Sequence, residues 1–209
     1  SVNASGTQYT LRQGNIFYVS TEGSDENTGD HPQDPYRTLK RALDAADGSD
    51  LQPVTIHVLA GTYEEELPLT VPSYVSVIGS DVRNTIVKPA IGFSNADAFL
   101  LDGDCTIENI TVKDFYYDDN IGYAFRFKQD AIIKERSPYI QNGTVITKGS
   151  TVSSQDPRGF AAGDAGGGAY VDGAVLDPVS ESASMLFSGC TFITPNADAL
   201  VMTNGVRVE

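Results

Sequence analysis

Three six-residue segments repeat one pattern, and this repetition constrains the fold more than any other feature of the chain. Each segment reads apolar, polar, Asn or Gly, variable, Thr, apolar, and the segments are 107–112, 140–145 and 187–192. The first two begin 33 residues apart and the last two 47, so the period favours coils of a solenoid that differ by insertions. We therefore expect three structural rungs, Thr111, Thr144 and Thr191, to be stacked along one sheet.

A longer repeat in the sequence indicates the same architecture. The sequence Asn-Ala-Asp-Ala occurs at 95–98 and again at 196–199, and each copy is followed by an apolar run. The second copy reaches Glu209 at the position that matches Glu108 in the first. We expect the natural product to continue beyond Glu209, and the last coil of this chain to be shielded by another copy or by assembly contacts.

Short apolar runs dominate the chain from Val54 onward, and each is closed by Gly, Asn, Asp or Pro. Such runs predict either a β-sandwich or a stacked β architecture, and the repeats favour the stack. In stacked coils, Asn tolerates the left-handed backbone of a sharp corner and can hydrogen-bond its counterpart in the next coil. We predict an all-β fold, a single-stranded right-handed parallel β-helix over residues 16–209 that is truncated at its C-terminal end.

Three segments depart from the strand pattern. Residues 1–15 are polar and predict an N-terminal arm or linker. Residues 36–46 place Leu39, Ala42, Leu43 and Ala46 on one helical face, so we expect a helix that caps the first coil. Residues 148–184 are rich in Gly, Ser and Asp and predict a projecting loop.

The composition excludes several classes of function. A net charge of -14 disfavours nucleic acid and anionic lipid as partners, because both are polyanions. Two cysteines without a CxxC motif give neither a disulfide framework nor a zinc site. No apolar run is long enough to insert into a membrane, and no secretion signal is visible.

Two resemblances to known families extend these expectations. The segment FYVSTEGSDENTGDHPQDPYRTLKRALDAA, followed by VTIHVLAGTYEEELPLTVPSYVSVIGSDVRNTIVKP, resembles the opening of the pectate-lyase-like β-helix superfamily over residues 16–90. That resemblance implies the fold and says little about activity. The segments GAYVDGAV, ASMLFSGCTFITP and ALVMTNGVRVE are similar to virion structural proteins of tailed phages that infect marine cyanobacteria. This second resemblance implies a tail, fibre or other adsorption-related component.

Enzymes of the superfamily need specific sets of catalytic residues, and the sequence does not identify such a set. The methylesterase motifs are absent, and the segment most similar to them is 128–131. A polysaccharide lyase needs a cation held by several carboxylates and a Lys or Arg as base, whereas a glycoside hydrolase needs two or three carboxylates at a set separation. The acids that could serve are Asp102, Asp104, Glu108, Asp114, Asp118 and Asp119, with Lys113, Arg126 and Lys128 as nearby bases. A solvated acidic face explains the same acids, so we assign no catalytic residue.

Binding residues are easier to nominate than catalytic ones. Sugars stack on aromatic rings while carboxylates hold their hydroxyls, so the carbohydrate-contact candidates are Tyr116, Tyr117, Asp118 and Asp119. We expect Tyr123, Phe125 and Phe127, which alternate along a strand, to point inward. Asp25, Asn27 and Asp30 could bind calcium, although Asx-turns explain the same residues without a metal.

These observations favour a non-catalytic phage structural or adhesion module, a rigid rod that contacts host-surface polysaccharide and requires no cofactor. Such rods associate as trimers or with other virion proteins, so we expect a virion location, with no nucleic acid partner and no membrane insertion. The alternative is a carbohydrate-active enzyme, a lyase or a glycoside hydrolase that acts on an acidic polysaccharide.

Overall fold

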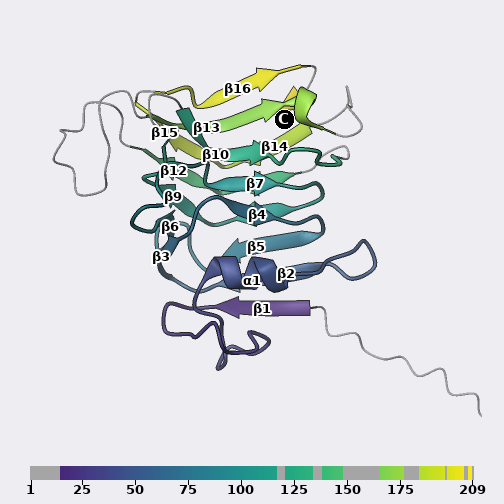
Figure 1. Ribbon diagram of the computed structural model, residues 1–209, viewed down its shortest axis with the longest axis vertical. Helices are drawn as coiled ribbons and strands as arrows, with labels where there is room; N and C mark the ends of the chain where they lie inside the picture. The colour runs from purple at the N-terminus through teal and green to yellow at the C-terminus, as the bar shows by residue number, and fades with distance from the viewer. Residues whose placement is uncertain are drawn as a thin grey trace, which may run out of the picture.

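The computed structural model contains three parallel sheets, and the strands of each sheet are stacked along one common axis (Figure 1). It describes residues 15–116, 121–133, 138–147, 165–176, 184–195, 197–204 and 207–208. Sheet I comprises β1 (Asn15–Val19), β2 (Val54–Val58), β5 (Val75–Gly79), β8 (Thr106–Glu108), β11 (Tyr139–Gln141), β14 (Ser184–Ser188) and β17 (Arg207–Val208). Sheet II comprises β3 (Gly61–Glu65), β6 (Thr85–Pro89), β9 (Thr111–Lys113), β12 (Thr144–Ile146) and β15 (Thr191–Ile193). Sheet III comprises β4 (Leu69–Val71), β7 (Phe99–Leu101), β10 (Ile121–Phe127), β13 (Ala165–Asp172) and β16 (Leu200–Thr203).

The chain passes from sheet I to sheet II to sheet III and then returns to sheet I one level higher. Thus β2, β3 and β4 form one coil, and β5, β6 and β7 form the next. Every pair of neighbouring strands is parallel, as in the contacts of β5 with β2 and with β8. This path is the parallel β-helix that the repeats predict, and the alternative β-sandwich is wrong.

Apolar alternation explains which side of each strand faces the core. In β2 the fully or almost fully buried Val54, Ile56 and Val58 alternate with partly exposed residues. The same alternation recurs in β5, and the register places Val77 beside Ile56. Because side chains alternate across a strand, the inward residues of successive coils stack into apolar rows that fill the interior.

The three repeated segments occupy one point of the coil, as expected. Thr144 lies beside Thr111 in one direction and beside Thr191 in the other, so the three threonines stack along sheet II. At the corner between sheets I and II, Asn109 and Asn142 have φ of 57° and 47°, and the Asn142 Nδ2 donates to Asn109 Oδ1 at 2.7 Å. The Asn pattern is therefore a corner ladder.

The helix α1 (Leu39–Ala45) is shorter than the predicted 36–46 because Tyr36 forms a parallel bridge with Val19 and Thr38 is the N-cap. It buries Leu39, Ala42 and Leu43 and contacts β1, β2, β3 and β4. Figure 1 shows it at the lower end of the stack, where it covers the first coil as expected. Within the described ranges, no helix is long and apolar enough to cross a membrane.

The predicted loop over 148–184 is wrong for residues 165–176, which form β13 and a short 3-10 helix, Gly173–Val175. The glycines of β13 are required because neighbouring coils pack closely against this strand. A Cβ atom at Gly167 would lie 2.7 Å from the Tyr123 ring, and one at Gly168 would overlap the carbonyl oxygen of Ala199. A glycine-rich segment can thus be a strand where neighbouring coils approach closely. The remaining parts, 148–164 and 177–183, lie outside the described residues, as does most of the 1–15 arm.

Candidate functional site

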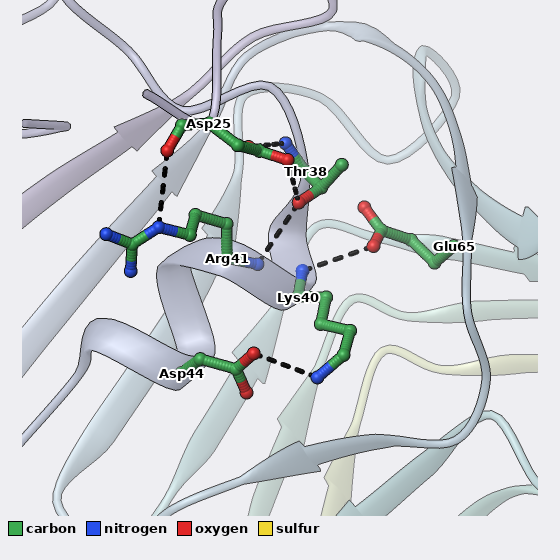
Figure 2. Close-up of polar contacts among 6 residues, drawn as sticks. All are labelled: Asp25, Thr38, Lys40, Arg41, Asp44 and Glu65. Carbon is green, nitrogen blue, oxygen red and sulfur yellow. Dashed lines mark hydrogen bonds and ion pairs between the residues drawn. The ribbon is translucent and has the colours of Figure 1, made fainter. Parts of the chain in front are cut away.

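One cluster of polar side chains lies at the start of α1 (Figure 2). The Asp25 carboxylate accepts hydrogen bonds from the Arg37 and Thr38 backbone N–H groups, each at 2.9 Å, and from the Thr38 hydroxyl. The Glu65 carboxylate accepts from the backbone N–H of Leu39 at 2.6 Å and of Lys40 at 3.1 Å. Two carboxylates therefore satisfy the first N–H groups of the helix and the N–H groups just before it, which have no partners within the helix.

Burial dominates the electrostatics of Glu65. Its side chain comes from β3, the residue is 2% exposed, and burial raises its pKa to about 7, although its two backbone hydrogen bonds act in the opposite direction. A cavity of about 360 Å³ beside it is lined mainly by Thr, Arg and Glu residues of the loop and of β3. Because Asp25 and Glu65 both bond the backbone, we interpret this cluster as the attachment of α1 to the first coil.

The candidate calcium residues bond their own loop. Asp25 is engaged as described, Asn27 Nδ2 donates to the Pro35 carbonyl oxygen at 2.8 Å, and Asp30 accepts from the Thr28 hydroxyl. Among the described residues, no group of three or more His, Cys, Asp or Glu side chains is placed to hold a metal ion. Calcium binding by this loop stays a prediction.

Of the carbohydrate-contact candidates, only Tyr116 can be placed. It is 6% exposed and forms a parallel bridge with Asn95, so the expectation of a surface ring at this position is wrong. Residues 117–119, which include Tyr117, Asp118 and Asp119, lie outside the described residues.

Among the described residues, acids that lie close together in the sequence are distributed over different sheets of the fold. Asp102 directly follows a strand of sheet III, Glu108 ends a strand of sheet I, and Lys113 ends a strand of sheet II. Each coil distributes successive residues over three faces, so neighbours in sequence are separated in space. Lys113 therefore does not share a face with Arg126 and Lys128.

The outer side of sheet III brings together a different set of residues. One row across the strands joins Thr70, Leu100, Arg126, Tyr170 and Val201, all of which are partly or fully exposed. Adjacent strands are about 4.8 Å apart, so this row spans roughly 19 Å along the solenoid axis. Figure 1 shows its five strands stacked from β4 at the bottom to β16 at the top. We call this surface the outer face of sheet III.

Arg126 is the centre of this face. Its guanidinium carbon lies 4.8 Å from the centroid of the Tyr170 ring and 5.2 Å from that of Tyr123, and its Nε lies 3.1 Å from Asp97 Oδ2. Asp97 is 3% exposed and its Oδ1 accepts from the Tyr123 backbone N–H at 2.8 Å. Burial raises the pKa of Asp97, while that hydrogen bond and Arg126 lower it. A guanidinium thus lies over two aromatic rings and within ion-pair distance of a buried carboxylate.

A second, polar row flanks the first. Lys128 Nζ lies 2.9 Å from Asp102 Oδ2, and both groups are partly exposed. On the next strand, Asp172 Oδ1 accepts from Asn204 Nδ2 at 2.7 Å and from the Ala174 backbone N–H at 2.9 Å. The face therefore combines a partly exposed ring with side chains that can both donate and accept hydrogen bonds.

Sequence reasoning missed Tyr170 and Asp97, and it did not predict the contact of Tyr123 with Tyr170. Phe125 and Phe127 are buried as expected, with Phe125 stacked on Phe99. Tyr123 is buried too, at 5% exposed, but its ring contacts Tyr170 of the next coil and is not part of the main core cluster. The signal for Tyr170 was the alternation of Ala, Tyr, Val and Asp in 169–172, which the adjacent glycines obscured.

Comparison with known families gives one match. Residues 21–95 match a family model described as "Protein of unknown function (DUF1565)". The match covers the α1 cluster and the first coils, nearly the same segment that carries the superfamily resemblance. No curated protein matches the chain.

Two solved structures with a similar fold can be compared with the chain. The chain is similar to a structure titled "Rhamnogalacturonan lyase", with a TM-score of 0.48 and 13% identity over 93% of this chain and 62% of that one. It is also similar to "Pectin methylesterase PemA from Erwinia chrysanthemi", with a TM-score of 0.38 and 10% identity over 81% of this chain and 54% of that one. The chain thus spans less than two thirds of the length of either structure.

Proposed function

We propose that this chain is a non-catalytic β-helical module that contacts polysaccharide through the outer face of sheet III. The observation that carries the proposal is the packing of Arg126 between Asp97 and the rings of Tyr123 and Tyr170. A ring held in place by its neighbours binds the apolar face of a sugar with little loss of conformational entropy. The flanking Asp102, Lys128 and Asp172 supply acceptors and donors for hydroxyl groups.

The rigid scaffold supports the adhesion part of the proposal. Parallel coils place the residues of this face at a fixed spacing, so several weak sugar contacts can act together. On the resemblance of its later segments to phage virion proteins, we assign the module to a tail, fibre or related component of a phage particle. Self-association as a trimer would multiply the contacts. Sedimentation at equilibrium tests this, and a strict monomer that binds no polysaccharide contradicts the proposal.

An enzyme that cuts an acidic polysaccharide is the second candidate, because Lys128 and Asp102 lie on the same face as Arg126. Lys128 is paired with Asp102, and Arg126 with Asp97, so both bases already have carboxylate partners. We expect no unsaturated product when the protein is incubated with uronate polymers, with or without added calcium. Sustained turnover that Arg126→Ala abolishes would establish the enzyme instead.

Substitution of Tyr170 tests the binding proposal directly. We expect Tyr170→Ala to weaken polysaccharide binding by about tenfold or more, measured by titration calorimetry against a panel of soluble glycans. Tyr18→Ala is the matched control, because Tyr18 is a partly exposed ring stacked on His57 in sheet I, away from this face. Equal binding by both variants and by the unaltered protein would place the site elsewhere.

A further inference from the structure

The charges on the outer face of sheet III suggest which class of glycan it takes. Its two cations are each in contact with a carboxylate: Arg126 with Asp97 at 3.1 Å and Lys128 with Asp102 at 2.9 Å. An anionic ligand would therefore have to compete with a carboxylate that is already in place. The Asp97 side chain is only 5% exposed, so this competitor is also shielded from solvent and cannot turn away into water.

Further carboxylates add an excess of negative charge. Asp172 lies two residues beyond Tyr170 on the same side of β13 and interacts electrostatically with Arg126. Asp198 precedes β16, is exposed, and interacts electrostatically with Tyr123. Among the described residues of this face, two cations thus meet four carboxylates, on a chain of net charge -14. The field repels polyanions at a distance as well as in contact.

The remaining features of the face suit an uncharged ligand. Leu100 and Val201 flank Arg126 and Tyr170 in the outer row, so apolar side chains lie on both sides of the guanidinium and the ring along the solenoid axis. Asp102, Lys128, Asp172 and Thr203 run parallel to them on the same side. A sugar chain lying along the axis can stack its rings on one row and place its hydroxyls on the other.

We infer that the outer face of sheet III binds an extended, uncharged glycan along the solenoid axis and discriminates against uronate and other polyanionic polymers. This inference rests on the proposed function, because it assumes that the face binds carbohydrate. In this inference Arg126 orients the rings of Tyr123 and Tyr170 and does not bind an acidic group of the ligand.

Titrations against two sets of soluble polymers test the inference. The uncharged set is dextran, soluble starch and galactomannan, and the anionic set is polygalacturonate and alginate. We expect at least one uncharged polymer to bind at least about tenfold more tightly than either anionic one. Its affinity should change by less than about twofold between low and physiological salt, because no net ion pairing is formed.

Three variants localise the effect. Tyr170→Ala should weaken binding of the uncharged polymer by about tenfold or more, whereas Tyr170→Phe keeps the ring and should retain binding. This pair distinguishes a loss of folding from a loss of stacking. Asp198→Asn should strengthen anionic binding, because it removes one of the four carboxylates of the face.

The outcomes separate the two claims. Tight, salt-sensitive binding of polygalacturonate or alginate that depends on Tyr170 overturns the inference while the proposed function stands. Absence of binding to every polymer overturns the proposed function, and the inference with it.

Discussion

Burial of Glu65 beneath the first turn of α1 couples the stability of the first coil to pH. Its folded-state pKa of about 7 exceeds the ordinary value of 4.5 because of burial. Between these two values the folded protein holds a proton that the unfolded chain has released. The stabilisation is therefore complete below pH 4.5 and is lost as the pH rises through 7, and it amounts to something on the order of 3 kcal/mol.

We predict that the free energy of unfolding of the unaltered protein falls relative to that of Glu65→Gln as the pH is raised from about 5 to about 8. Glutamine cannot titrate, so the difference between the two proteins isolates the contribution of Glu65. Urea denaturation at several pH values measures it. Glu66→Gln is the control, because Glu66 is exposed and adjacent in the sequence. Parallel pH curves for the unaltered protein and Glu65→Gln would refute the coupling.

Asn142 stabilises a corner in two separable ways. Its φ of 47° is a left-handed conformation that asparagine tolerates better than most residues, and its side chain bonds Asn109. We predict that Asn142→Ala lowers the free energy of unfolding by about 1–2 kcal/mol, whereas Asn142→Gly, which accepts the backbone conformation and loses only an exposed hydrogen bond, costs less. Urea denaturation compares them. An equal loss in both variants would mean that the backbone conformation contributes nothing.

At the scale of single elements, β13 depends on its glycines for close packing. A Cβ atom at Gly168 would overlap the Ala199 carbonyl oxygen and the Phe192 ring, which belong to the next coil. We predict that Gly168→Ala lowers the free energy of unfolding by about 1–3 kcal/mol, the usual range for overpacking. Gly143→Ala is the control, because its nearest neighbouring atom would be 3.3 Å away. Thermal unfolding followed by circular dichroism distinguishes the two, and similar melting curves would contradict the packing argument.

The same elements show what the sequence could predict. The rungs at Thr111, Thr144 and Thr191 were predictable because each coil repeats its corner, and a corner imposes the same residue types every time. The β13 strand was not, because its glycines are explained by backbone and rings of other coils that are distant in sequence. The Arg126 and Tyr170 contact escaped prediction for the same reason, since a register between two coils of unequal length cannot be counted from one sequence.

Across the whole molecule, negative charge exceeds positive charge twofold, with 28 acidic and 14 basic residues. Ion pairs cannot remove this excess, because pairing every basic residue would still leave 14 acidic residues without a partner. Three of the four ion pairs between the described residues, such as Lys88 with Glu64, have both partners partly exposed, so each contributes little. Repulsion among the uncompensated carboxylates acts over the length of the solenoid and opposes the compact state.

We therefore predict that the melting temperature rises when sodium chloride is increased from about 10 mM to about 150 mM, because the Debye length shortens from about 30 Å to about 8 Å. Screening weakens the attractive pairs as well, but these are short-range and few, whereas the repulsions are long-range and many. Calorimetry at about pH 8, where the acids are ionised, measures the shift. Potassium chloride should give the same shift at equal ionic strength, since the effect depends on screening and not on a specific cation. A melting temperature that falls with salt would show that local ion pairs outweigh the repulsion.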